Sequence, residues 1–123
     1  MTKKSVLVVD DEPQVQSLFS EVLALHGFGV TGAMNGESAI KYLQNNKPAV
    51  VFLDLKLSDM DGGQVLTRLR KIHPNVPVVI ITGYPRDSLV DNVIALGIFA
   101  CLVKPFSMAD VLAILETLEL QVV

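Results

Sequence analysis

The chain has 123 residues, half of them hydrophobic, which is enough for one compact domain with an apolar core and too short for two. No apolar run approaches the ~18 residues that span a bilayer, and the run nearest the N-terminus stops after four residues at two acids, so we expect neither a membrane protein nor an exported one. A net charge of −3 without a basic run gives no sign of nucleic-acid or membrane binding, and the single cysteine, Cys101, excludes an internal disulfide and fits a reducing, cytoplasmic location.

Apolar runs and helical periods alternate along the chain and predict five strands, each followed by a helix. In chain order the predicted strand and helix pairs are residues 6–9 and 15–23, 28–34 and 38–43, 50–53 and 65–72, 78–81 and 89–94, and 99–103 and 108–115. Residues that start and end helices agree with this pattern, because Pro13 suits a first helical turn and Gly97 suits a helix end. Ser107 suits an N-cap, with Asp110 in the capping-box position.

The composition of the apolar runs predicts how the strands are arranged. Those at 6–9, 50–53, 78–81 and 99–103 are rich in β-branched residues and do not alternate with polar ones, which is typical of parallel strands buried on both faces. The run at 28–34 carries glycines and fits a shorter or edge strand. The alternation predicts an α/β fold, a single doubly wound (βα)5 flavodoxin-like sandwich whose parallel sheet has the order 2-1-3-4-5.

Polar residues stand where these strands end. Asp10 and Asp11 follow the first strand, Asp54 the third, Thr82 the fourth and Lys104 the fifth. Ligands of such sheets bind beyond the carboxyl ends of the strands, and in this order the first and third strands are central neighbours. We therefore expect three carboxylates to meet in one crevice, beside a hydroxyl and an ammonium.

Three acids in one crevice repel one another. At about 4 Å each pair costs ~4 kcal/mol at an effective dielectric constant of 20, and the sum is comparable to the stability of a domain. An ammonium offsets part of this cost, a hard divalent cation offsets more, and an all-oxygen site suits Mg²⁺. The alternative is that each acid only caps a helix, as Asp11 could, and we assign Asp59 and Asp61 to a turn. Capping does not account for acids, a threonine and a lysine on four strand ends.

Four segments carry a resemblance to a known family. They are VLVVDDE (6–12), VVFLDLKLSDMDG (50–62), VVIITG (78–83) and LVKPF (102–106). In order and spacing they are similar to the receiver domain of two-component response regulators, the CheY-like family that includes the bacterial chemotaxis regulator. The similarity extends over essentially the whole chain, and the combination is far more specific than any one segment.

The resemblance implies a metal site and a nucleophile. Asp54 would be the phosphoacceptor, which becomes an acyl phosphate. Asp11, Asp54 and the backbone carbonyl of Lys56 would bind Mg²⁺ directly, and Asp10 would act through water. Positioning and charge neutralisation supply most of the catalysis in such a transfer, so a carboxylate suffices as nucleophile.

The resemblance also implies a switch. Thr82 would donate its hydroxyl to the phosphoryl group, and Lys104 would pair with it, aimed by a cis bond to Pro105. Lys56 and Tyr84 would border the pocket mouth and tune how water attacks the acyl phosphate. Displacement of the last two strand ends would reshape the surface formed by the fourth helix, the fifth strand and the fifth helix.

Cys101 departs from the family pattern. The family usually has Tyr or Phe three residues before the lysine, and that ring turns inward when the threonine moves. A thiol cannot fill the same cavity, so we expect the usual coupling to be absent. We favour a small buried hydrophobe at Cys101 over a redox role.

The expected function is a Mg²⁺-dependent phosphoacceptor, which modifies only itself and is otherwise not an enzyme. Its partners would be a histidine kinase or phosphotransfer domain and a downstream protein or output domain, with a phosphorylation-linked dimer as a further option. The chain could be a single-domain regulator spanning residues 1–123 or a receiver from a longer protein. An aspartyl-phosphate phosphatase is disfavoured because Asp54 lacks an acid two residues later, and an unphosphorylated interaction module is disfavoured by the complete acid, threonine and lysine set.

Overall fold

A five-stranded parallel sheet forms the centre of the molecule in the computed structural model, which describes residues 4–120. The strand order is β2-β1-β3-β4-β5, so the predicted fold class is confirmed. The strands are β1 (Lys4–Val9), β2 (Phe28–Ala33), β3 (Val50–Asp54), β4 (Val78–Thr82) and β5 (Ala100–Val103). The helices are α1 (Pro13–Leu25), α2 (Gly36–Asn45), α3 (Gly62–Ile72), α4 (Ser88–Leu96) and α5 (Met108–Thr117). Residues 1–3 and 121–123 of the predicted domain lie outside the described residues.

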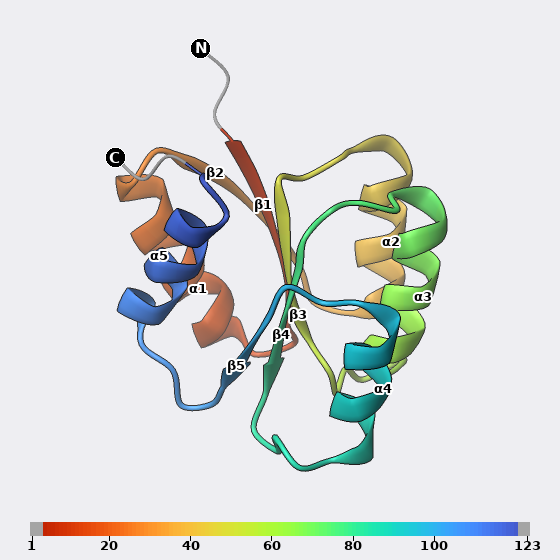
Figure 1. Ribbon diagram of the computed structural model, residues 1–123. Helices are drawn as coiled ribbons and strands as arrows, with labels where there is room; N and C mark the ends of the chain where they lie inside the picture. Colours follow the sequence, from red (N-terminus) through yellow and green to blue (C-terminus); the bar gives the residue numbers. More distant parts are fainter. Residues whose placement is uncertain (1–3, 121–123) are drawn as a thin grey trace.

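Side chains of the central strands alternate between two layers of helices. Helices α2, α3 and α4 cover one face of the sheet, and α1 and α5 cover the other (Figure 1). The strand residues facing the first layer include Leu7, Val9, Val51, Leu53, Val78 and Ile80. Those facing the second include Val6, Val8, Val50, Phe52, Val79 and Ile81. Because burying one such side chain contributes about 1.5–3 kcal/mol, the two cores hold the carboxyl ends of the strands firmly in place.

Polar side chains determine where several helices begin. Asn35 caps α2, and Ser107 and Asp110 form the predicted capping box at the start of α5. At the start of α3, Asp61 and Gln64 form a second capping box. The assignment of Asp61 to a turn is therefore wrong: it satisfies a backbone N–H that has no partner inside the helix.

Strand β5 differs from the expectation that its run is buried on both faces. It pairs only with β4 and forms an edge of the sheet. Leu102 is buried, whereas Val103 is 44% exposed, Phe99 just before the strand is 43% exposed, and Cys101 is exposed. The interpretation of Cys101 as a buried hydrophobe is wrong, because the predicted order itself places this strand at the sheet edge, where side chains are less covered.

None of the helices described between residues 4 and 120 combines the length and apolar character needed to cross a bilayer.

Candidate functional site

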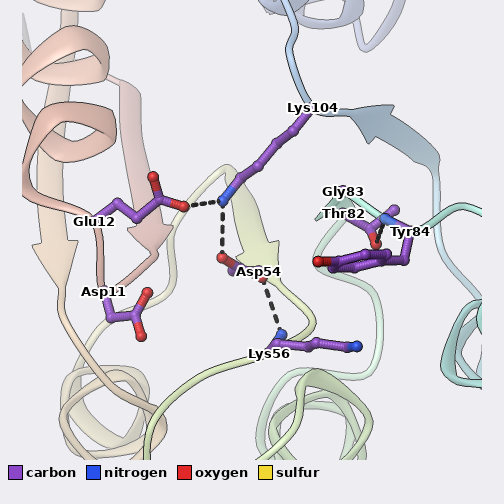
Figure 2. Close-up of a pocket in the computed structure, with 8 residues that line it drawn as sticks. All are labelled: Asp11, Glu12, Asp54, Lys56, Thr82, Gly83, Tyr84 and Lys104. Atoms are coloured by element: carbon purple, nitrogen blue, oxygen red, sulfur yellow. Dashed lines mark hydrogen bonds and ion pairs between the residues drawn. The ribbon is translucent and has the colours of Figure 1, made fainter.

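A pocket of about 360 Å³ opens at the carboxyl ends of the strands. Its lining residues are Asp11, Glu12, Asp54, Lys56, Thr82, Gly83, Tyr84 and Lys104 (Figure 2). They come from the ends of β3 and β4 and from the segments that follow β1, β3, β4 and β5. Side chains distant in the sequence therefore meet in one place, as the strand order requires.

The two central strands place Asp10 and Asp54 side by side. Asp54 is the last residue of β3 and is 7% exposed, while Asp10 directly follows β1 and is fully buried. The Asp10 N–H donates to the Ala33 carbonyl at the end of β2 (3.0 Å), and Asp10 Oδ1 accepts from the Glu12 N–H (2.9 Å). The turn after β1 is thus fixed by hydrogen bonds on both sides of Asp10.

Three acids form a tight cluster in this turn and beside it. Asp10, Glu12 and Asp54 each offer a carboxylate oxygen, and these oxygens lie within 4.8 Å of one another. Burial, together with repulsion from Asp54, raises the pKa of Asp10 to about 6, despite the opposing hydrogen bond from Glu12. Asp10 Oδ2 is buried and makes no hydrogen bond within residues 4–120. The protein therefore maintains an electrostatically costly arrangement at this position.

Lys104 is the cation that faces all three acids. Its Nζ lies 2.6 Å from Glu12 Oε1, 3.1 Å from Asp54 Oδ2 and 3.4 Å from Asp10 Oδ2 (Figure 2 shows the first two). Partial burial disfavours the charged amine, but hydrogen bonds to Glu12 and Asp54 outweigh burial and raise the pKa of Lys104. Lys104 is therefore charged at neutral pH.

The segment after Lys104 is anchored in the core. The Lys104–Pro105 peptide bond is cis. Phe106 packs edge-on against Phe19 of α1, with ring centroids 5.9 Å apart, and Phe19 in turn packs against Phe52 of β3 at 5.0 Å. This aromatic stack ties the segment that carries the lysine to the strand that carries Asp54.

Thr82 and Lys56 form the opposite wall of the pocket. Thr82 ends β4, is 3% exposed, and accepts a hydrogen bond from the Tyr84 N–H at its Oγ1 (3.0 Å). The Lys56 N–H donates to Asp54 Oδ1 (3.0 Å). The Lys56 side chain crosses the pocket mouth, with Nζ 4.4 Å from the Tyr84 ring centroid and 3.2 Å from Asp87 Oδ2.

Glu12 is the residue that the sequence reasoning missed. It is the nearest partner of Lys104 and a member of the acidic cluster, whereas Asp11 is exposed and lines the pocket without belonging to that cluster. The signal for Glu12 was present, since it directly follows two acids at a strand end. Glu12 stands three positions after the last strand residue, beyond the two positions at which strand-end ligands were expected.

The donor set fits a hard divalent cation. Its members are carboxylate oxygens, and one of them, Asp10 Oδ2, is buried without a hydrogen bond within residues 4–120. Lys104 supplies one positive charge against three acids, so a net negative charge remains. Oxygen ligands and a net negative charge are what Mg²⁺ requires.

Comparisons with known proteins agree with this geometry. The chain is 39% identical over 93% of its length to the probable transcriptional regulatory protein TcrX of Mycobacterium tuberculosis, and it spans 49% of that protein. It is 31% identical over 90% of its length to sporulation initiation phosphotransferase F of Bacillus subtilis, of which it covers 90%. A CheY-like response regulator receiver domain protein from Methanospirillum hungatei JF-1 superimposes with a TM-score of 0.91 at 26% identity, covering 98% of this chain and 97% of that one.

The family model of the response regulator receiver domain matches residues 6–116. This range includes most of β1, all of β2 to β5, every pocket residue and most of α5. A match of this extent, with a relative aligned over nearly its whole length, leaves no major part of the fold unaccounted for. The chain belongs to the response regulator receiver domain family.

Proposed function

We propose that Asp54 is the phosphoacceptor of this receiver domain and that the pocket around it serves phosphoryl transfer. The observation that carries the proposal is the environment of its carboxylate. Oδ1 accepts the Lys56 N–H and Oδ2 lies 3.1 Å from Lys104 Nζ, so both oxygens are oriented at the pocket floor. An oriented carboxylate beside a fixed cation is what a nucleophile for this reaction needs.

The proposed step is an in-line displacement. A carboxylate oxygen of Asp54 attacks the phosphorus of a phosphohistidine, a new O–P bond forms, and the P–N bond breaks. The imidazole nitrogen leaves with the bonding pair and takes a proton from solvent. Water later attacks the acyl phosphate, which releases inorganic phosphate and restores the carboxylate.

Mg²⁺ is the cofactor that we propose for the site, where it would neutralise charge on the transferred oxygens. Asp11, Asp54 and the backbone carbonyl of Lys56 would hold it, with Asp10 acting through water. Glu12 belongs to the same acidic cluster and adds to the negative potential that attracts the cation. Lys104, whose Nζ lies 3.1 Å from Asp54 Oδ2, supplies a second positive charge.

Phosphorylation would change the partners of Thr82 and Lys104. The Lys104 ammonium can exchange Glu12 for a phosphoryl oxygen, and the Thr82 hydroxyl can donate to another. Thr82 ends β4, which leads into α4, and Lys104 directly follows β5, which leads into α5, so their movement would alter the α4-β5-α5 surface. Cys101 lies on this surface as an exposed small residue, and we propose that the switch operates without an aromatic ring at that position.

Receiver domains are signalling modules that interact with histidine kinases or phosphotransfer proteins and with output domains. For this chain we propose a phosphohistidine donor of that kind and a downstream protein or output domain as recipient. We further propose that the whole chain acts as one receiver domain and turns over no substrate beyond its own acyl phosphate.

A small phosphodonor tests the proposal. The chain is incubated with acetyl phosphate in Mg²⁺ or in EDTA, and intact mass is measured. We expect the mass of one phosphoryl group to be gained in Mg²⁺ only, and Asp54→Asn to abolish the gain.

Asp91→Asn, an exposed acid of α4 that does not line the pocket, is the matched control and should be phosphorylated as the wild type is. A phosphoryl group that still appears on Asp54→Asn, or a wild type that stays unmodified with both acetyl phosphate and a phosphohistidine donor, would refute the assignment.

A further inference from the structure

Gln16, in the second turn of α1, makes an unusual set of contacts outside the pocket lining. The two N–H groups of its side-chain Nε2 face three backbone carbonyl oxygens, those of Val8 (2.9 Å), Asp10 (3.0 Å) and Ala33 (3.1 Å), so one N–H is shared between two of them. These carbonyls belong to the ends of β1 and β2 and to the turn that follows β1. One amide group thus joins two strand ends to the first turns of α1.

The hydrogen bonds of Gln16 help to fix the backbone that carries the acids after β1. The Asp10 N–H already donates to the Ala33 carbonyl, and Gln16 binds the Asp10 carbonyl. Both peptide groups that flank Asp10 are therefore fixed, and the second of them is the one that begins Asp11. Carboxylates carried on a turn keep their direction only if the backbone of that turn is fixed.

The orientation of the Gln16 amide leaves its oxygen without a hydrogen bond. Oε1 is buried and has no hydrogen-bond partner within residues 4–120. Turning the amide over would bring Oε1 against three carbonyl oxygens, so the donors must point at the strand ends. A buried acceptor left without a partner is uncommon and calls for an explanation.

Gly32 of β2 provides the space for this amide. A Cβ added at Gly32 would lie 2.4 Å from Gln16 Oε1 and 2.9 Å from Gln16 Cδ. Any larger residue at position 32 would push the amide away from the carbonyls. Gln16 and Gly32 are therefore matched to each other across the β2 edge.

We propose that Gln16 is a positioning residue for the cation site: its amide fixes the turn after β1, which carries Asp10, Asp11 and Glu12, and Gly32 leaves room for the amide. This positioning role depends on the proposed function in one respect, which is that the cation is Mg²⁺. Gln16 itself touches neither the cation nor the phosphoryl group.

The test measures MgCl₂ binding to the full chain by titration calorimetry. Gln16→Leu keeps the approximate shape and removes the donors, and it should weaken Mg²⁺ binding on the order of tenfold, as loss of an outer-shell partner typically does. Gly32→Ala should weaken binding in the same direction by displacing the amide. Gln44→Leu, an exposed glutamine of α2, is the matched control and should bind as the wild type does.

Two further readouts separate positioning from a general loss of stability. Amide hydrogen exchange of Asp10 should accelerate in Gln16→Leu while amides of β4 keep their protection. In a Gln16→Ala background, Gly32→Ala should have no additional effect on Mg²⁺ affinity, because the clashing amide is gone. A variant that was merely destabilised would show neither pattern while it remained folded.

Folded Gln16→Leu and Gly32→Ala variants with the wild-type Mg²⁺ affinity would overturn the proposal, and so would a wild type that binds no Mg²⁺. If Gln16→Leu does not fold, Gly32→Ala and the double variant decide the matter. A wild type that binds Mg²⁺ but gains no phosphoryl group would refute the proposed function and leave the role of Gln16 open to test. The Mg²⁺ affinities of the wild type and the variants could still be compared.

Discussion

At the scale of single residues, the pocket is defined by an imbalance of charge. Lys104 faces Asp10, Glu12 and Asp54, and one ammonium cannot neutralise three carboxylates. At about 4 Å, each uncompensated pair costs up to ~4 kcal/mol at an effective dielectric constant of 20. Burial raises the pKa of Asp10 to about 6, and repulsion from Asp54 acts in the same direction, so both favour the protonated acid.

Asp10→Asn should therefore stabilise the domain when no divalent cation is present. The pKa of Asp10 is raised from 3.8 to about 6, so at pH 7 the ionised carboxyl opposes folding. Replacing it with an uncharged amide should increase the free energy of unfolding on the order of 1–2 kcal/mol, measured by urea denaturation in EDTA. Glu21→Gln, an exposed acid of α1, should change it little. A less stable Asp10→Asn variant would mean that the Lys104 contact outweighs burial.

At the scale of elements, the loop from β3 to α3 is tied down on two sides. On one side Lys56 contacts Asp87, the N-cap of α4, and lies over the Tyr84 ring. On the other, Asp59 accepts the backbone N–H groups of Gly36 (2.8 Å) and Glu37 (3.0 Å) at the start of α2. The loop that follows the proposed phosphoacceptor is thus linked to the N-termini of two helices.

Removing the Lys56 side chain should shorten the lifetime of the acyl phosphate. The backbone carbonyl stays in place in Lys56→Ala, but the pocket mouth loses an exposed ion pair and a cation–π contact. Each contributes up to about 1 kcal/mol, so we expect hydrolysis to accelerate by about 2- to 5-fold. The measurement is the decay of phosphorylated protein after the donor is removed, with Lys41→Ala of α2 as control. An unchanged or longer lifetime would show that the side chain does not shield the phosphoryl group.

Asp59 should make the link to α2 sensitive to acid. Hydrogen bonds from the Gly36 and Glu37 N–H groups hold the pKa of Asp59 below its usual 3.8. Because the folded-state pKa is depressed, this stabilisation is complete above about pH 3.8 and is lost as the pH falls through the folded-state value. The difference in unfolding free energy between wild type and Asp59→Asn should shrink on acidification below pH 3.8. A difference that stays constant from neutral pH to acid unfolding would contradict this role.

At the scale of the whole molecule, periodic features were predictable and contextual ones were not. The strand order could be predicted because five apolar runs alternate with helical periods, and this pattern is typical of a parallel sheet whose strands are covered by helices on both faces. The apolar composition of the fifth run favoured burial of Cys101, although the predicted order places that strand at the sheet edge, where Cys101 is in fact exposed. The capping role of Asp61 depends on its reciprocal hydrogen bonds with Gln64 in the first turn of α3, and the role of Glu12 depends on its distance to Lys104.

Mg²⁺ should stabilise the whole domain, because the two cores already hold the repelling acids in position and the cation relieves their repulsion. Binding to the folded state alone adds RT ln(1 + [Mg²⁺]/Kd), about 2.7 kcal/mol at a concentration 100 times Kd. For a domain of this size that corresponds to a rise in Tm of roughly 10 °C, measured by calorimetry against NaCl of equal ionic strength. Asp54→Asn removes one carboxylate of the cluster and should reduce the rise, whereas Asp91→Asn should retain it. Equal Tm values in Mg²⁺ and in matched NaCl would mean that Lys104 alone satisfies the acids and that no cation site exists.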